Sequence, residues 1–453
     1  MSNSEASSGP VDQFKAFFES HGHPNCMKLF GVLLVLTLVE IGWASTLPFV
    51  DYHLKDAQVF DQDAGDEAGA GSDWGLLCKA IVADEAADRR AVRNAELAAA
   101  LPAADANKDG ALSAEELAKA DSGFGVAFAV NALGSFPIIL GGTEEQKQQW
   151  LPQIAAGEKF VAFCLSEKFA GSDAGGLSVR AFEDGDEYVI CGEKKWTTNG
   201  GVADIYSVFC VTDPTSKSRR ISALVVEKGT PGFEVKKVED KMGIRCVPVV
   251  ETHFDHVRVP KSNLIGGRAG MGFKHAMMTL DYARPGVAAQ AVGACQGALD
   301  LANVYSNRRQ QFGVPISKHQ MVQKMMADMA MKTEAARQLV YAAAAGIDSV
   351  GPSPANSKMA AMAKCFATDM AMEVATDAVQ VFGGYGFMED YPIAKFFRDA
   401  KILQIYEGTN QIQRLVIARH LIREAGDLEH LSEFVPFEEQ QPYHQEDGVA
   451  QNA

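Results

Sequence analysis

The sequence predicts an α+β protein in which a β domain precedes a bundle of helices. From residue 157 to 268, short apolar runs such as YSVFCVTD and ISALVVEK alternate with turns such as TDPTSK, a pattern that predicts antiparallel strands. From residue 269 to 428, apolar residues recur at helical spacing, which predicts a four-helix bundle with helices near 271–307, 317–346, 355–383 and 410–425. In the last helix, the expected buried face consists of Ile412, Leu415, Val416 and Leu421.

Composition narrows the class of protein. The chain has 453 residues and a formal charge of −16, which disfavours nucleic acid as a partner. Its 8 cysteines include no C-x-x-C pair, so neither a disulfide framework nor a zinc site is indicated. We therefore expect reduced thiols.

An apolar stretch, KLFGVLLVLTLVEIGWASTLPFV, occupies residues 28–50. Roughly 20 apolar residues cross a bilayer, so the stretch predicts a single transmembrane helix within the N-terminal segment 1–50. The long, partly acidic flank is untypical of a cleaved signal sequence. A buried hydrophobic helix is the alternative, and Glu40 and Pro48 favour it.

Polar segments lie on either side of the folded region. Residues 51–104 comprise an acidic, glycine-rich linker and a helical stretch rich in alanine and charge. Residues 429–453 end in EEQQPYHQEDGVAQNA, which predicts a disordered tail.

The segment DANKDGALSAEE, residues 105–116, fits the spacing of a calcium-binding loop. Gly110 stands where such a loop turns. The candidate ligands are Asp105, Asn107, Asp109, Ala111 and Glu116. The alternative is a capping box, because Ser113 begins an S-x-x-E sequence at the start of a helix.

Several motifs then follow one another in a characteristic order: EELAKADSGFGVAF (115–128), SEKFAGSD (166–173), WTTNG (196–200), DKMGIR (240–245), RRQQFG (308–313), QVFGGYGF (380–387) and IYEGTNQIQR (405–414). With these motifs, the chain from about residue 113 to 426 resembles the acyl-CoA dehydrogenase family. The resemblance implies a helical N-domain, a middle β domain and a C-terminal helix bundle. Residues 105–156 would retain only the last helices of a truncated N-domain.

The resemblance identifies Glu407, in YEGT, as the catalytic base that removes the α-proton of a fatty acyl-CoA while the β-hydride moves to the flavin. Such a base needs a desolvated carboxylate with a raised pKa. We expect Ile405 and Tyr406 to supply the apolar surroundings, and the backbone N–H of Glu407 and a flavin hydroxyl to bind the thioester oxygen. The alternative is an acid placed at a helix N-terminus by the helix dipole.

The resemblance also implies FAD as the cofactor. The residues expected along the flavin are Phe163, Leu165, Ser166, Gly171, Ser172, Trp196, Thr197 and Thr198. Those expected to reach the FAD of a neighbouring subunit are Arg309, Phe312, His319, Gln320, Gln380, Val381, Gly383 and Gly384, so a homo-oligomer is expected. Thr409 and Gln411 begin a helix, whose N-terminus suits phosphate. The alternative for Trp196 is a core aromatic of the sheet.

The expected contacts to the acyl-CoA substrate are Ser172, Asp281, Arg284 and Gly408. For Arg284 and Arg309, the alternative is a surface ion pair. One departure from the family pattern concerns the flavin loop, where Lys168 and Phe169 replace a proline and a glycine of T-E-P-G-A-G-S-D. Phe169 does not readily adopt a positive φ.

Two functions follow. The first is a membrane-anchored flavoenzyme that oxidises acyl-CoA to 2-enoyl-CoA and passes electrons to an electron-transfer flavoprotein or another acceptor. The second is an accessory, structural subunit of a mitochondrial membrane (respiratory) complex with weak or no dehydrogenase activity. In either case the expected location is a membrane, crossed once, with the mitochondrial inner membrane favoured.

Overall fold

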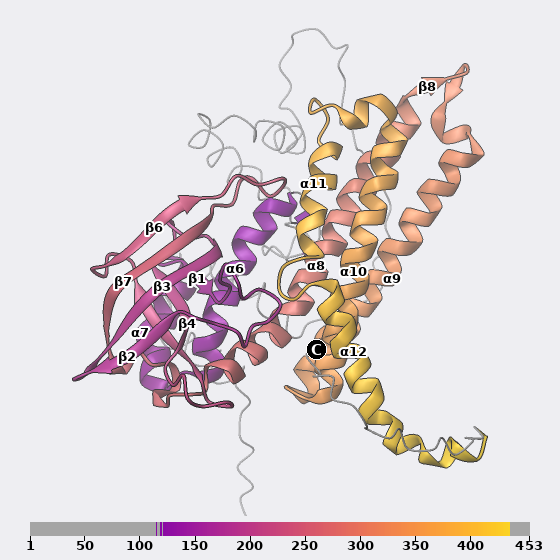
Figure 1. Cartoon of the computed structure of the whole chain (residues 1–453). Coiled ribbons are helices and arrows are strands. Elements are labelled where there is room, and N and C mark those ends of the chain that lie inside the picture. Colours follow the sequence, from indigo (N-terminus) through magenta and orange to yellow (C-terminus); the bar gives the residue numbers. More distant parts are fainter. Residues whose placement is uncertain (1–114, 116–117, 120, 435–453) are drawn as a thin grey trace, which may run out of the picture.

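The structure is a computed structural model that describes residues 115, 118–119 and 121–434 (Figure 1). The predicted transmembrane stretch at 28–50, the linker at 51–104, the candidate calcium ligands and the tail beyond residue 434 lie outside the described residues. Within the described part, no group of three or more His, Cys, Asp or Glu side chains is arranged to hold a metal ion.

Within the described residues, the helices α6 and α7 precede the sheet. Helix α6 (Ser122–Gly141) begins at Asp121, whose side chain accepts a hydrogen bond from the backbone of Phe124, and α7 (Glu144–Ala155) begins with a capping box at Thr143. Among the described helices, α6 is the one that is long and apolar enough to cross a membrane, but 67% of its apolar window is buried inside the protein. It is therefore a core helix, lying between the sheet and the bundle (Figure 1).

The middle domain is one seven-stranded sheet in the order β1-β4-β2-β3-β7-β6, with β5 also paired to β4. Its strands are β1 (Val161–Cys164), β2 (Arg180–Asp184), β3 (Glu187–Thr198), β4 (Ile205–Val211), β5 (Ile221–Glu227), β6 (Phe233–Val238) and β7 (Val249–Pro260). The prediction of an antiparallel sheet was partly wrong, because β4 pairs in parallel with β1 and with β2. Alternating apolar residues look alike in both kinds of pairing, so the sequence pattern does not distinguish them.

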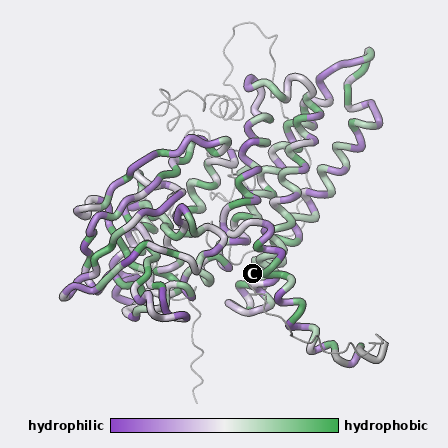
Figure 2. The backbone as a smooth tube through the Cα atoms, viewed as in Figure 1, coloured by the Kyte–Doolittle hydropathy of each residue, from purple (hydrophilic) through white to green (hydrophobic). Residues whose placement is uncertain are grey.

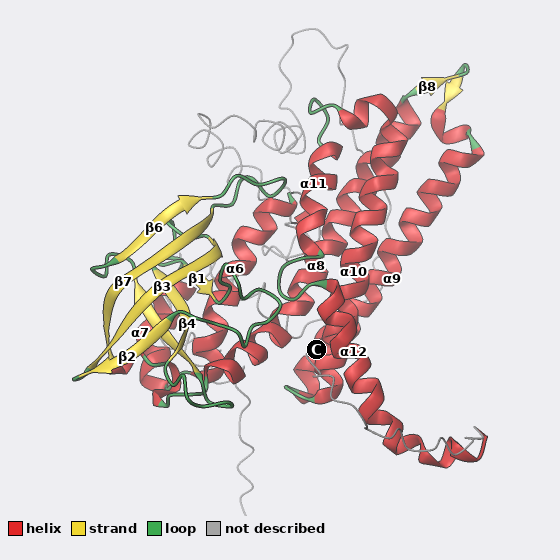
Figure 3. Cartoon of the chain, in the orientation of Figure 1, coloured by secondary structure: helices red, strands yellow, loops and turns green. Residues whose placement is uncertain are grey.

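The four predicted helices of the bundle are confirmed (Figure 3). They are α8 (Gly272–Arg308), α9 (Gln320–Val350), α10 (Pro354–Phe382) and α12 (Asn410–Glu424). A shorter helix, α11 (Ile393–Leu403), was not predicted. Short elements complete the described chain: η3 (Lys261–Asn263), η4 (Ile265–Gly267), β8 (Gln310–Gln311), β9 (Val314–Pro315), η5 (Ile316–Lys318), η6 (Gly383–Phe387) and η7 (Ala425–Phe434).

The last helix departs from the prediction. Of the predicted buried face, Leu415 and Leu421 are 60% and 50% exposed, while Ile412 and Val416 are half-buried, so this face is only partly covered within this chain. Only Asn410 and Gln413, at the start of the helix, are buried, and the helix then extends away from the bundle as an arm in which polar and apolar residues alternate (Figure 2). The helical turn η7 continues through residues 429–434, where a disordered tail was predicted.

A buried ionic cluster joins the three parts of the fold. The Nζ atom of Lys395, on α11, lies 3.0 Å from Oδ1 of Asp121 and 2.6 Å from Oδ2 of Asp399. The hydroxyl of Ser122 and the backbone N–H of Ile244 also donate to Asp399, at 2.7 and 2.5 Å. The cluster therefore links the start of α6, the loop before β7 and the bundle.

Candidate active site

Glu407 lies in the corner between α11 and α12. It has a positive φ of 52°, and Gly408 follows with a φ of 91°. A side chain in this left-handed region is strained and persists where the surroundings enforce it, most often at functional sites. L side chains rarely adopt the φ of 91° at Gly408, so this corner favours glycine after Glu407, and an added Cβ atom would also displace Nε2 of Gln413, which would lie 2.5 Å away.

Side chains from two helices hold the backbone of this corner. Lys364, on α10, donates to the carbonyl of Gly408 at 2.9 Å, and Nε2 of Gln413 donates to the same carbonyl at 3.0 Å and to that of Glu407 at 3.3 Å. The hydroxyl of Thr409 caps α12 by accepting from the backbone of Ile412 at 3.3 Å. The corner is thus fixed from both sides of Glu407.

The surroundings give Glu407 the properties of a base. Burial raises the pKa of Glu407 to about 7, although the cations Lys364 and Arg284 each lower it. Oε2 of Glu407 is buried, in keeping with the expected desolvated carboxylate, but Ile405, which was expected to supply part of the apolar surroundings, is 48% exposed. Tyr406 packs against the bundle instead and donates its hydroxyl to Gln290 at 2.8 Å.

Three of the predicted substrate contacts, Asp281, Arg284 and Gly408, lie at the corner that carries Glu407. Nη1 of Arg284 lies 2.5 Å from Oδ1 of Asp281, and Nη2 of Arg284 would lie 3.7 Å from a Cβ atom on Gly408. Arg284 is 5% exposed, so the alternative of a surface ion pair is wrong. Ser172, the fourth predicted contact, is exposed on the loop between β1 and β2.

Three buried polar atoms at this corner have no hydrogen-bond partner within the described chain: Oε2 of Glu407, Nε of Arg284 and Oε1 of Gln413. Buried polar groups are normally paired. A cluster of three unpaired atoms beside a carboxylate of raised pKa therefore indicates a site that receives a polar ligand.

The predicted flavin loop follows β1. Phe163 packs on Phe209, with ring centroids 5.0 Å apart, and the carbonyl of Leu165 accepts from Nζ of Lys194 at 2.9 Å. The carbonyl of Ser166 accepts from the backbone of Lys195 at 2.9 Å. These contacts fix the backbone of the loop against β3.

Glu167 and Lys194 form a buried ion pair at 2.8 Å beneath this loop, and sequence reasoning missed both residues. Glu167 also accepts hydrogen bonds from the backbone of Ser178 at 2.7 Å and of Val179 at 3.0 Å. The ion pair therefore holds the start of the loop against the segment that leads into β2. The expected difficulty at Phe169 does not arise, because Phe169 has no positive φ and its side chain is 91% exposed.

The side chain of Trp196 is exposed on the surface rather than packed into the sheet. It has a φ of 57° at a register shift between Lys194 and Thr197, and it is 54% exposed. The alternative of a core aromatic is therefore wrong. The next residue, Thr197, is buried, and its hydroxyl lies 3.5 Å from Sγ of Cys164. Thr198 is half-buried.

This end of β3 lies close to the Glu407 corner. The backbone of Asn199 donates to the carbonyl of Pro248 at 2.8 Å. The neighbouring residue Val247 belongs to an apolar cluster against which Tyr406 packs. The exposed indole of Trp196 and the corner that holds Glu407 are thus connected through the β domain and α11.

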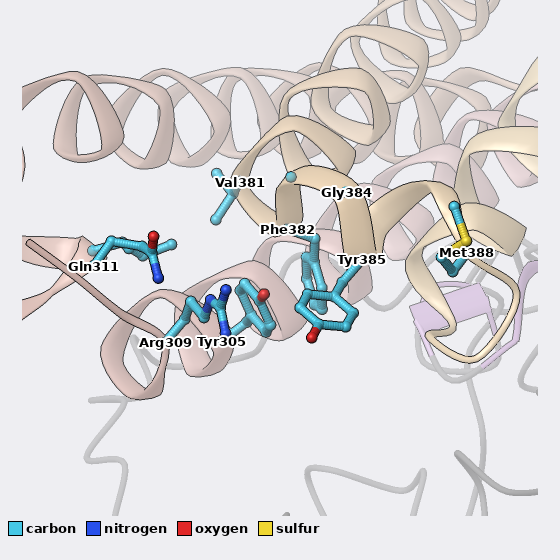
Figure 4. A pocket seen from close by; sticks show the side chains of 10 residues that line it. Tyr305, Arg309, Gln311, Val381, Phe382, Gly384, Tyr385 and Met388 are labelled. Atoms are coloured by element: carbon cyan, nitrogen blue, oxygen red, sulfur yellow. The ribbon is translucent and has the colours of Figure 1, made fainter.

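The other predicted cofactor residues gather at the far end of the bundle. Arg309, Val381, Gly383 and Gly384 line a pocket of about 460 Å³ together with Tyr305 and Tyr385 (Figure 4). The guanidinium of Arg309 lies 5.3 Å from the ring centre of Tyr385. Both glycines face open space, which lets a ligand approach the backbone.

The hairpin beside this pocket carries Phe312, which is 94% exposed with a φ of 55°. Its ring lies 5.7 Å from that of His319. Gln320, which follows His319, and Gln380, which precedes Val381, are both exposed. A helix rises 1.5 Å per residue, so Arg309 lies roughly 35 Å from Arg284 along α8. The structure therefore divides the predicted cofactor residues between two ends of the bundle.

The sequence of the chain is similar to those of known proteins. Sequence models match the acyl-CoA dehydrogenase N-terminal domain over residues 105–158, the middle domain over 162–257 and the C-terminal domain over 270–422. A probable acyl-CoA dehydrogenase of Mycobacterium leprae is 50% identical over 68% of this chain and 79% of its own.

Solved structures agree with these matches. The butyryl-CoA dehydrogenase of Megasphaera elsdenii has a TM-score of 0.67 and 36% identity, covering 93% of this chain and 100% of that one. A glutaryl-CoA dehydrogenase of Mycobacterium smegmatis in complex with FADH2 has a TM-score of 0.64 and 30% identity, covering 69% of this chain and 78% of that one.

Proposed function

Because the chain belongs to the acyl-CoA dehydrogenase family of FAD-dependent oxidoreductases, we propose that it oxidises an acyl-CoA thioester to the 2-enoyl-CoA. The observation that carries this proposal is the buried carboxylate of Glu407, whose Oε2 atom is unpaired and whose pKa is raised to about 7. A base of this strength is partly ionised at neutral pH and takes up a proton readily.

The residues of the corner have different roles in this reaction. Oε2 of Glu407 takes the proton from the α-carbon, and the left-handed turn with Gly408 keeps that oxygen directed inward. Arg284 and Lys364 favour the ionised form before the reaction. When bound, FAD supplies the acceptor for the β-hydride. The backbone N–H of Glu407 serves the thioester oxygen.

The chain fits FAD at both ends of the bundle. The half-exposed Trp196 and the fixed loop at 163–172 suit the flavin ring. Arg309 and the two open glycines of the pocket suit the nucleotide end, because a guanidinium pairs well with phosphate and stacks on aromatic rings.

The direct test is reduction of the flavin by substrate. We expect the purified protein to carry FAD and to lose its oxidised flavin absorbance when mixed anaerobically with acyl-CoA thioesters of increasing chain length. Free CoA is the control, because it lacks the α-proton. A protein without flavin absorbance would contradict the proposal and favour the accessory, structural subunit as the alternative.

Further parts of the proposal rest on the sequence. Attachment to the mitochondrial inner membrane by one helix at 28–50, and calcium binding by residues 105–116, stay predictions because both segments lie outside the described residues. An electron-transfer flavoprotein is the proposed electron acceptor.

The separation along α8 predicts a homo-oligomer. Arg309 and Glu407 lie too far apart to contact one FAD molecule within a chain, so the pocket at Arg309 should complete the cofactor site of a second copy. We expect Arg309→Ala to weaken FAD binding at least tenfold, and light scattering to show at least a dimer whenever FAD is bound. The exposed Arg268→Ala is the control. A monomer in detergent with full flavin occupancy would refute this prediction.

A further inference from the structure

Lys364 is fully buried near the middle of α10. The adjoining sequence, AAMAKCFA, is apolar, and burial lowers the pKa of Lys364 to about 8. A buried ammonium is costly unless its donors are satisfied. Here it donates to the carbonyl of Gly408 and to Oδ1 of Asn410, each at 2.9 Å.

Both acceptors belong to the corner that carries Glu407. Gly408 follows Glu407 directly, and Asn410 is the first residue of α12. The amide of Asn410 in turn donates to Thr368 at 2.8 Å and to Asp369 at 2.7 Å. The backbone of the corner is therefore tied to α10 by a buried network in which Lys364 is the cation that contacts it.

We propose that Lys364 is a positioning residue for Glu407, which holds the turn through the Gly408 carbonyl and supplies the buried positive charge that keeps Glu407 ionised. This inference rests on the proposed function, because it assigns Lys364 a role in the proton transfer to Glu407. Lys364 itself touches neither the α-carbon nor the flavin in this role.

The charges around Glu407 single out Lys364. From α8, Arg284 faces Glu407, but its guanidinium is paired with Asp281 at 2.5 Å. From its own segment, Tyr406 carries a hydroxyl with a pKa raised by burial, so that group stays neutral. On α10, Asp369 is paired with Arg414. Within the described chain, Lys364 contacts only neutral acceptors, so its charge acts on Glu407 without a carboxylate partner.

The main test replaces Lys364 with the similarly sized Met. An opposite charge nearby shifts a carboxyl pKa by about 1–3 units, so the pH midpoint for flavin reduction by acyl-CoA should rise by about one to two units. At pH 7 the rate should fall roughly tenfold, while KM changes little. Lys364→Arg retains the cation and should restore the midpoint. An unchanged midpoint in a folded, FAD-loaded Lys364→Met protein would overturn the proposal.

Two further variants separate the effect of charge from that of structure. Lys358 lies on the same helix as Lys364, and its ammonium pairs with Glu424 at 2.6 Å. Lys358→Met removes this ammonium and should leave the midpoint unchanged. Asn410→Ala loosens the corner but keeps the charge of Lys364, so it should lower the rate at every pH without raising the midpoint. A midpoint raised equally by Asn410→Ala would show that the role of Lys364 is structural only.

Infrared difference spectra between the wild type and Glu407→Gln give a readout that does not depend on turnover. Recorded across pH without acyl-CoA, they report the protonation of Glu407. We expect the same upward shift on a Lys364→Met background. This measurement decides the role of Lys364 even if no acyl-CoA reduces the flavin, whereas that failure would refute the proposed function itself.

If Lys364→Met does not fold, the double variant Lys364→Met/Asn410→Leu takes its place. It removes the ammonium and the side-chain acceptor together, and removing both partners of a buried hydrogen bond costs less than removing one. The midpoint should again rise by about one to two units, and an unchanged midpoint would overturn the proposal equally.

Discussion

Glu407→Gln is expected to slow flavin reduction by acyl-CoA on the order of a hundredfold or more, while the protein keeps its fold and its FAD. Glutamine has nearly the same shape but cannot take up the α-proton. The pKa of Glu407 is raised to about 7, so the wild-type rate should increase as the pH rises through 7 and the carboxylate forms. The measurement is single-turnover bleaching of the flavin under anaerobic conditions.

Glu389→Gln is the matched control, because Glu389 is a solvent-exposed acid with a 3.7 Å contact to Arg398, apart from the corner. Its bleaching rate should equal that of the wild type. A Glu407→Gln protein that bleaches at the normal rate would show that a different group removes the proton, and a normal rate without dependence on pH near 7 would argue against a base of this pKa.

The corner that carries Glu407 was predictable because its signals are local. The sequence YEGT, followed by a helical run, located Glu407 at a helix start, and the structure shows the turn with positive φ at Glu407 and Gly408. The source of burial was not predictable from neighbours in sequence. Ile405 is half-exposed, and Tyr406 is half-buried and bonds to Gln290 of α8, more than a hundred positions earlier.

The supporting cations were missed for the same reason. Lys364 stands in an apolar helical run, and Lys194 stands at an inward-facing position of β3; both side chains are fully buried. A lysine at a core position is the signal that could have identified them, because a buried charge requires partners. The partners, Gly408 and Glu167, come from other segments, so only the fold shows what the charges hold.

The exposed face of α12 illustrates a different limit. Its apolar spacing correctly predicted a helix, yet Leu421 and Ile422 are exposed. Periodicity shows that a face is apolar but not which surface covers it. Exposed leucine and isoleucine side chains of this kind are consistent with the homo-oligomer expected from the divided cofactor residues. The pairing of β4 with β1 and β2 was likewise invisible, because strand neighbours are set by topology.

The second large effect is expected at the domain junction, where Lys395→Met should lower the free energy of unfolding by about 3–5 kcal/mol. The substitution removes the ammonium that contacts both Asp121 and Asp399, whose side chains are buried at 2% and 1% exposure. Because this cluster holds α6, the loop at Ile244 and α11 together, the loss should also separate the β domain from the bundle and weaken FAD binding. Urea unfolding followed by circular dichroism measures the first effect, and flavin release measures the second.

Lys332→Met provides the matched control. Lys332 also lies between two carboxylates, 2.9 Å from Glu373 and 3.6 Å from Asp377, but Glu373 is 52% exposed. Exposed ion pairs contribute about 0–1 kcal/mol, so this variant should unfold nearly as the wild type does. Similar losses for both variants would mean that the burial of Lys395 adds nothing to stability. A large loss confined to Lys395→Met, with flavin released before the sheet unfolds, would show that the buried charge joins the domains that build the cofactor site.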